Sequence, residues 1–548
     1  MQKTGKRQNF MYGAAILTAG VIVMKILGAI YKIPLGNILG DYGYGLFYAT
    51  YNVYNIFFTL STAGLPVALS RLIAEADANG RIRQEEKTFK TALATFACIG
   101  LFFSALMFIG SDWLAANYLK KPLAALSIKT MSPAILLVCL VSAYRGYCQG
   151  NGNMIPTTVD EVLEVLFKVI SGLVIASLIL RSGKGLPVAS AGAISGVTIG
   201  GTVSLLFMIL YRRFNYVSLS QAYTSGRSPD DVPEDDDLTD SAWRIAGNIL
   251  KISIPIALGA SIMAILTSLD PGICARRLAA AGFAEYDADV LYGVYSKAIT
   301  LFNLPAALTQ PLTISCVPAI AAALALGVKK ESDKVSEDSL RITAVLAMPM
   351  AVGLGVMAYP IMKIMYPSSH ASGPALLRIM AAASFFVCMV LIENAILQAS
   401  GKERLPMYSM VSGSLVKIAV NWILIANPSV NIVGAPVGTL IGYIWMCVMN
   451  YIFIRKTVGV RPRISRILIK PFLCSVIMGT SALGSYTLLA KALGADSSLK
   501  MAVCAGISII LAVLVYLVTV SVFKTVTDED MKLIPGGEKV GKILRLSH

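Results

Sequence analysis

The sequence predicts an all-α polytopic membrane protein with about fourteen transmembrane helices. Of its 548 residues, 56% are hydrophobic and only 14% are charged, whereas a soluble protein carries about 25% charged residues. The apolar residues fall in repeated blocks of roughly 20 or more, the length that an α-helix needs to cross a bilayer. A transmembrane β-barrel would show alternating segments of about ten residues instead.

Short polar stretches separate the apolar blocks, and each block defines one predicted span. The eighth block is long, and Pro305, Pro311 and Pro318 are candidate breaks within it. The basic start MQKTGKRQNF has no small-residue cleavage site after it, so we expect a cytoplasmic tail and no signal peptide. The predicted spans are residues 12–39, 44–70, 91–110, 123–148, 157–180, 187–211, 245–271, 290–326, 341–362, 374–400, 406–426, 433–454, 467–490 and 499–523.

Basic residues orient the spans. The loops on one side carry about three times as many Lys and Arg residues as the loops on the other side. Because such residues stay in the cytoplasm, we place both termini inside. This bias also accounts for most of the net charge of +16. Since no basic and aromatic module lies outside the spans, we expect no nucleic-acid partner.

Two glycine motifs predict an internal repeat. Residues 192–200 (GAISGVTIG) and 434–442 (GAPVGTLIG) both read GAxxGxxxG, in spans six and twelve. QGNGNMIP (149–156) and QASGKERLP (398–406) each close an even-numbered span. One glycine pattern alone indicates only close helix packing. Two matches in corresponding helices predict two six-helix lobes in parallel orientation, with a substrate site between them.

The repeat predicts four regions of the chain. Residues 1–211 form the N-terminal lobe and residues 245–454 the C-terminal lobe. Residues 212–244 form a cytoplasmic linker that contains the acidic stretch SPDDVPEDDDLTD. Residues 455–548 hold helices thirteen and fourteen and a basic cytoplasmic tail.

Three lysines lie within predicted spans, where an ionisable residue costs about 2.5–3.5 kcal/mol. Lys25 lies near the middle of span one, and Lys32 follows seven residues later on the same helix face, about 10 Å along the axis. Lys297 lies in span eight beside Tyr292 and Tyr295. Each side chain could snorkel to the interface. Together the three could instead form a cationic site for an anionic substrate with phosphate groups.

Acidic residues within the spans have two interpretations. Glu164 and Lys168 are four residues apart in span five, so we expect a local salt bridge between them. Glu393 of span ten and Lys417 of span eleven are expected to form an interhelical pair. The alternative is a coupling site for Na⁺ or H⁺ among these four residues.

We expect no cofactor, metal site or disulfide. The nine cysteines lie mostly within apolar segments and form no CxxC pair, so we expect small buried residues. The only two histidines, His370 and His548, lie in a loop and at the C-terminal end of the sequence.

Three segments carry a family resemblance: MKILGAIYKIPLGNILGDYGYGLF, STAGLPVALSRLIAEA and YRGYCQGNGNMIPTTVDEVLEVLFKV. With them, the chain resembles the polysaccharide-biosynthesis and stage V sporulation protein B branch of the multidrug/oligosaccharidyl-lipid/polysaccharide exporter superfamily. The lipid II flippase (MurJ) family is a close relative of this branch. The resemblance covers nearly the whole chain.

The resemblance implies a flippase for undecaprenyl-pyrophosphate-linked peptidoglycan precursor in the bacterial cytoplasmic membrane. Cationic residues of the family's spans one and eight, which face a central cavity, fall on Lys25, near Lys32 and on Lys297. The family has arginines there, and this chain has lysines, which cannot grip pyrophosphate with two parallel hydrogen bonds. In span two, where some relatives carry an arginine, Asn52 and Asn55 are the polar residues. Helices thirteen and fourteen resemble those that form a lipid-tail groove.

Two further classes of function are open. One is an exporter of another lipid-linked polysaccharide, or a cation-coupled drug exporter, on the same fold. The other is a membrane glycosyltransferase or ligase. An enzyme of that kind needs catalytic carboxylates or a metal motif on its loops, whereas the few outer acids make no recognisable motif, so we expect no enzyme. These acids are Asp112, Glu285, Asp287 and Asp289.

Overall fold

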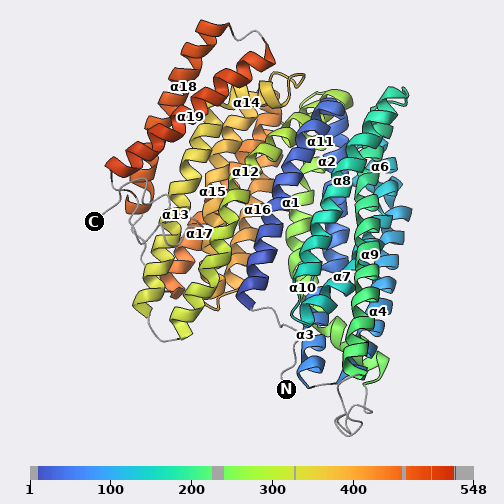
Figure 1. Cartoon of the computed structure of the whole chain (residues 1–548). Coiled ribbons are helices and arrows are strands. Elements are labelled where there is room, and N and C mark those ends of the chain that lie inside the picture. The colour runs from blue at the N-terminus through green and yellow to red at the C-terminus, as the bar shows by residue number, and fades with distance from the viewer. Residues whose placement is uncertain are drawn as a thin grey trace. The chain divides into compact units, whose positions relative to one another are not determined.

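The computed structural model describes residues 10–79, 81–224, 240–325, 329–458, 465–494, 497–523 and 525, and within these residues the chain is helical without a β-strand (Figure 1). The contacts divide it into two units. The first unit comprises Met1–Leu39 and Leu46–Gly272, and the second comprises Gly40–Gly45 and Ile273–His548. The short segment Gly40–Gly45, which begins α2, therefore belongs with the second unit.

The first unit contains the helices of the N-terminal half. Their bounds are α1 (Phe10–Ile38), most of α2 (Gly40–Thr62), α3 (Leu65–Ala78), α4 (Ile82–Ile109), α5 (Ser111–Trp113), α6 (Ala125–Met131), α7 (Pro133–Gly150), α8 (Ile155–Arg181), α9 (Leu186–Thr224) and α10 (Ala242–Ser268).

The second unit contains the helices that follow, beginning with most of α11 (Asp270–Ala280). The others are α12 (Glu285–Ala325), α13 (Lys329–Val356), α14 (Ala358–Met365), α15 (Gly373–Ala399), α16 (Arg404–Leu424), α17 (Gly434–Phe453), α18 (Lys470–Leu493) and α19 (Ser498–Val522).

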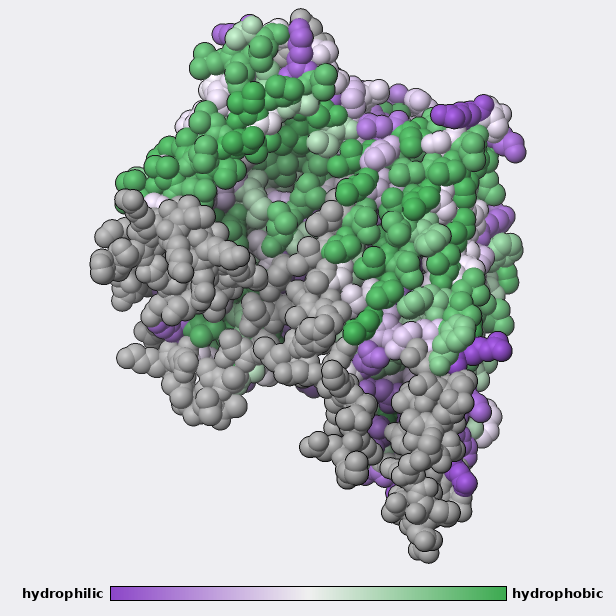
Figure 2. All heavy atoms as spheres, in the orientation of Figure 1, coloured by the Kyte–Doolittle hydropathy of each residue, from purple (hydrophilic) through white to green (hydrophobic). Residues whose placement is uncertain are grey.

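The chain is a multi-pass membrane protein. Twelve helical segments of the described residues are long and apolar enough to cross a membrane. The number fourteen stays a prediction, since the first and eighth predicted spans, which form α1 and α12, are not among these twelve. Figure 2 shows hydrophobic atoms where Figure 1 places α18 and α19. Large apolar side chains of these helices, Leu488, Leu499, Ile510, Leu514, Val518 and Val522, are exposed as lipid contact requires.

Several helix bounds differ from the prediction. The expected break in the eighth span is wrong, because α12 is one helix of 41 residues; membrane helices tolerate proline when other groups satisfy the freed carbonyls. Helix α4 begins at Ile82, well before the predicted residue 91, and α9 continues to Thr224. Residues 225–239 of the predicted linker lie outside the described residues, so the linker and the lobe boundaries stay predictions.

The second predicted span is kinked at Gly64, between α2 and α3. Gly64 has φ +84°, in the left-handed region that favours glycine. A Cβ atom there would lie 2.9 Å from Cβ of Ile256 and 3.0 Å from the carbonyl oxygen of Ser253, both on α10. Pro66 then occupies the first turn of α3, where its missing N–H leaves no donor unsatisfied. Glycine is therefore required for α3 to turn and pack closely on α10.

The two glycine motifs make the same packing contact in the two units. A Cβ at Gly196 of α9 would lie 2.7 Å from the carbonyl oxygen of Lys168 on α8, and one at Gly200 would lie 3.2 Å from Lys168 Cβ. The corresponding distances on α17 are 3.1 Å from Gly438 to the carbonyl oxygen of Lys417, and 3.0 Å from Gly442 to Lys417 Cβ. Each motif thus lets its helix approach the preceding one at an equivalent lysine; this agrees with the predicted repeat, while the two six-helix lobes stay a prediction.

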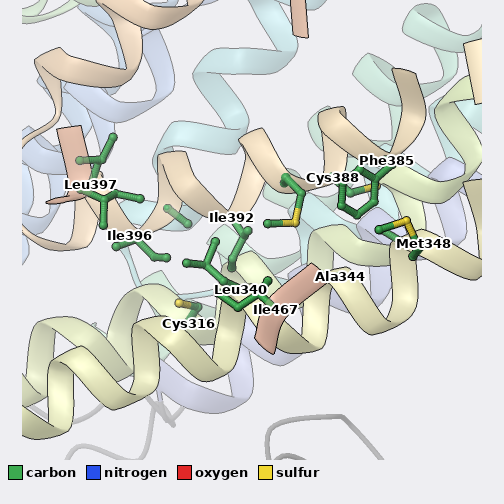
Figure 3. Close-up of a cluster of buried hydrophobic side chains, with 14 of the residues drawn as sticks. Cys316, Leu340, Ala344, Met348, Phe385, Cys388, Ile392, Ile396, Leu397 and Ile467 are labelled. Carbon is green, nitrogen blue, oxygen red and sulfur yellow. The ribbon is translucent and has the colours of Figure 1, made fainter. Parts of the chain in front are cut away.

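The second unit has an apolar core between α13 and α15 (Figure 3). Phe385, Cys388, Ile392 and Ile396 recur every three or four residues on α15 and are buried. Leu340, Ala344 and Met348 have the same spacing on α13. A face of such spacing buries its side chains against a neighbouring helix, so this core holds the helices that carry the second unit's polar residues.

Candidate functional site

The accessible side of α2 is a stripe of polar and aromatic residues. Tyr48, Tyr51, Asn52 and Asn55 are half-buried and recur at helical spacing, whereas Val53 between them is buried. We call these four half-buried residues the α2 stripe. Polar residues within a membrane helix face protein or a water-filled cavity rather than lipid. The structure therefore places both predicted asparagines on one face, beside two tyrosines that were not among the predicted site residues.

Lys32 of α1 lies at the first tyrosine of the α2 stripe. Its Nζ atom is 5.7 Å from the centre of the Tyr48 ring, within the range of a cation–π interaction. Lys25 lies two turns earlier on the same helix, which is continuous between them. The side chain of Lys25 is outside the described part of the structure, so the shared face of the two lysines stays a prediction.

Arg145 of α7 donates hydrogen bonds to two carboxylates of α8, and its Nη1 lies 3.8 Å from a third, at Glu161 Oε1. Its Nε donates to Asp160 Oδ2 at 2.6 Å, and its Nη2 donates to Glu164 Oε2 at 2.7 Å. The hydroxyl of Ser204 on α9 donates to the other oxygen of Asp160, which is fully buried. We call Arg145, Asp160, Glu164 and Ser204 the Arg145 network. It joins α7, α8 and α9 within the first unit.

The expected local salt bridge between Glu164 and Lys168 is wrong. Glu164 pairs with Arg145 instead, because the planar guanidinium offers two directed, charge-assisted donors to the neighbouring carboxylates. The Nζ atom of Lys168 is 6.0 Å from the centre of the Tyr51 ring. Lys168 therefore lies beside the α2 stripe, as Lys32 does.

Lys297 forms a buried ion pair with Asp41 in the second unit. Its Nζ is 2.6 Å from Asp41 Oδ1, and the side chains are only 2% and 8% exposed. Asp41 also accepts hydrogen bonds from Ser369 Oγ and from the backbone N–H of His370, both at 2.8 Å. The pair thus joins the start of α2 to α12 and to the loop before α15.

Tyr366 lies beside this ion pair. Lys297 Nζ is 5.0 Å from the centre of its ring. Burial raises the pKa of the Tyr366 hydroxyl, so the tyrosine stays neutral and contacts the ammonium through its π face. Asp41 is therefore the anion that balances Lys297. The sequence signal for it was an acidic residue in the first turn of a membrane helix, in GDYGYG (40–45).

Glu393 of α15 is buried without a cationic partner in the described part of the second unit. Its Oε1 accepts from Cys447 Sγ of α17 at 3.4 Å, and its Oε2 is buried without a hydrogen-bond partner. The expected interhelical pair of Glu393 with Lys417 is therefore wrong: α15 directs the carboxylate at α17, whereas Lys417 is on α16. Among the described residues, no group of three or more His, Cys, Asp or Glu could hold a metal ion.

Comparison with known families agrees with the predicted resemblance. A family model described as polysaccharide biosynthesis protein matches residues 10–324, and one described as MatE matches residues 286–423. Stage V sporulation protein B of Bacillus subtilis is 25% identical over 539 residues, which cover 96% of this chain and 98% of that protein. The B. subtilis lipid II flippase MurJ is 23% identical over 463 residues, covering 82% of this chain and 83% of the flippase.

Solved structures agree on the fold. A lipid II flippase MurJ in an inward closed conformation matches with a TM-score of 0.64 and 15% identity, over 93% of this chain and 98% of its own. A multidrug resistance MATE family transporter in an inward-facing conformation matches with a TM-score of 0.61 and 15% identity, over 81% and 98%. The similarity to stage V sporulation protein B agrees with the predicted branch, and the chain belongs to the polysaccharide biosynthesis protein family.

Proposed function

We propose that this protein is a flippase that moves lipid II, the undecaprenyl-pyrophosphate-linked peptidoglycan precursor, across the bacterial cytoplasmic membrane by alternating access. One observation carries the proposal: two half-buried lysines, Lys32 and Lys168, lie beside a polar stripe of a membrane helix in a chain of this family. A hydrophobic exporter substrate would not need ammonium groups at this position, whereas a lipid with an anionic head group would bind to them.

In this proposal, Lys25 and Lys32 of α1 bind the pyrophosphate as point charges while the prenyl tail stays in the lipid. We propose that Lys297 also binds substrate, in a state in which its pair with Asp41 opens. Asn52 and Asn55 offer amide donors and acceptors to the head group. Each of these contacts binds substrate without breaking a covalent bond, so the proposed protein is a transporter and not an enzyme.

Two alternatives are open within the superfamily that the chain resembles. The similarity to stage V sporulation protein B covers more of the chain than the similarity to the lipid II flippase, which favours a related lipid-linked polysaccharide or a sporulation role as the second candidate. A cation-coupled drug exporter is the third. For coupling, we propose Glu393, because a bound H⁺ or Na⁺ would give its unpaired Oε2 a partner; the membrane potential is the alternative drive.

The proposal is tested in bacterial cells depleted of their own lipid II flippases. Lipid II at the outer face is measured with a membrane-impermeant probe after this protein is expressed. We expect wild-type protein to restore outer lipid II. The double variant Lys25→Ala, Lys32→Ala should lower the rate by roughly tenfold or more, since each lost charge-assisted contact is worth about 1.5–3 kcal/mol. The variant Glu393→Gln is measured in the same assay to test ion coupling. A changed rate of lipid II transport would support a coupling role for Glu393, and an unchanged rate would contradict it.

Lys251→Ala is the matched control, because Lys251 is an exposed lysine on α10. This variant should transport as the wild type does. Wild-type protein that restores no outer lipid II would show that the substrate is wrong. A double variant that is present at normal levels and fully active would show that the lysines do not bind the pyrophosphate.

A further inference from the structure

Tyr51 of the α2 stripe is held in place by rings packed around it. Tyr51 stacks on Phe47 with ring centres 6.1 Å apart and planes 24° apart, and it lies 5.8 Å from the buried ring of Tyr54. Tyr54 in turn packs on Phe58 at 5.7 Å. Tyr51 itself stays half-buried. A partly accessible ring with rigid neighbours is a preorganised surface for a flat ligand.

Each accessible ring of the α2 stripe has an ammonium group within about 6 Å. Lys32 lies 5.7 Å from the ring centre of Tyr48, and Lys168 lies 6.0 Å from that of Tyr51. The position of Lys168 depends on the close contact of α8 with Gly196 and Gly200 of α9. The nearby carboxylate of Glu164 is bound by Arg145. Glu164 therefore does not pair with Lys168, whose ammonium group can attract an anionic group of a ligand.

These side chains together have the chemistry that recognises a saccharide. The negative π face of a tyrosine attracts the slightly positive C–H groups on one side of a pyranose ring. The amides of Asn52 and Asn55 can each donate to and accept from hydroxyl groups. The ammonium group of Lys168 attracts a carboxylate or phosphate on the sugar, and it repels an organic cation. The combination favours an acidic saccharide over a cationic drug.

We propose that the α2 stripe, with Lys168 of α8, is the subsite that binds the sugar rings of the substrate, and that its ligand is a pyranose saccharide with an acidic substituent. Tyr51 stacks on a ring, Asn52 and Asn55 bind hydroxyl groups, and Lys168 binds the acidic group. The inference rests on the proposed function and adds to it, because the pyrophosphate was assigned above to other residues.

The test separates sugar from pyrophosphate by comparing two lipids. Purified full-length protein in lipid nanodiscs is titrated with lipid II and with undecaprenyl pyrophosphate, which lacks the sugars. We expect Tyr51→Ala to weaken lipid II binding by roughly tenfold and to leave undecaprenyl pyrophosphate binding unchanged. Tyr51→Phe keeps the ring and should bind lipid II within about twofold of wild type. Tyr408→Ala, an exposed tyrosine on α16, is the control.

Each other outcome has a definite meaning. Equal weakening of both lipids by Tyr51→Ala, or no weakening of either, would overturn the sugar subsite. Wild-type protein that binds lipid II no more tightly than undecaprenyl pyrophosphate would overturn it also, while leaving the pyrophosphate site intact. Wild-type protein that binds neither lipid would overturn the proposed function for lipid II, and the subsite that rests on it.

Discussion

At the scale of single residues, burying the charges of Lys297 and Asp41 costs free energy, and their ion pair and hydrogen bonds offset that cost. Both side chains are nearly inaccessible, and Asp41 receives three donors. Removing one partner of such a pair costs about 3–5 kcal/mol, because the other charge stays buried and unpaired, whereas replacing both by apolar residues is often neutral. The pair is thus a stability determinant whatever Lys297 binds during transport.

We therefore predict a specific pattern for three variants. Lys297→Met should lower the thermal unfolding midpoint of the purified protein, and Asp41→Leu should do the same. The double variant Lys297→Met, Asp41→Leu should recover most of the loss. Thermal unfolding in detergent, followed by intrinsic fluorescence, measures the effect, with Lys251→Met as an exposed control. Losses that simply add in the double variant would mean that the two charges do not stabilise each other.

At the scale of helices, the glycine motifs determine how closely two pairs of helices approach. Gly196 faces the backbone of α8, and Gly438 faces both the Asn421 side chain and the Lys417 carbonyl oxygen of α16. A backbone atom cannot move aside as the end of a flexible side chain can, so an added methyl group must push the helices apart. Overpacking of this kind costs about 1–3 kcal/mol. Separating α8 from α9 would also displace Lys168 from the α2 stripe.

For this reason we predict that Gly196→Ala lowers both the unfolding midpoint and the affinity for lipid II. Gly247→Ala is the matched control: it lies on α10, and a Cβ there would meet nothing within 4 Å. In an open helical position alanine is favoured over glycine by about 0.5–1 kcal/mol, so this control should be as stable as the wild type or more so. If Gly196→Ala and Gly247→Ala have the same unfolding midpoint and the same affinity for lipid II, the glycine motif does not determine the distance between α8 and α9.

At the scale of the whole molecule, the distribution of Lys and Arg predicts how the chain lies in the membrane. With the N-terminus inside, the loop before α4 is cytoplasmic and the loop between α16 and α17 is outside. Asn79 and Ser429 are exposed in these two loops. They provide one reporter for each side.

We predict that Asn79→Cys reacts with a membrane-impermeant thiol reagent only in inside-out vesicles. Ser429→Cys should react only in intact cells. The background is Cys98→Ser, since Cys98 is the exposed one of the nine cysteines. The opposite pattern would reverse the orientation. It would also place Lys297 and Asp41 on the cytoplasmic side of the protein.

The sequence by itself determined the helical class, the paired glycine motifs, the family and the presence of lysines in two long apolar helices, α1 and α12. These follow from properties that each residue carries with it: apolar length, the lack of a side chain at glycine, and the cost of a charge in a membrane. The tertiary structure decided which groups meet. Asp41 and Lys297 are 256 residues apart in the sequence, and Glu164 pairs with Arg145 rather than with Lys168, four residues away. These pairs depend on which helix faces are buried against each other. The packing of all the helices in a unit determines those faces, and no local sequence pattern does.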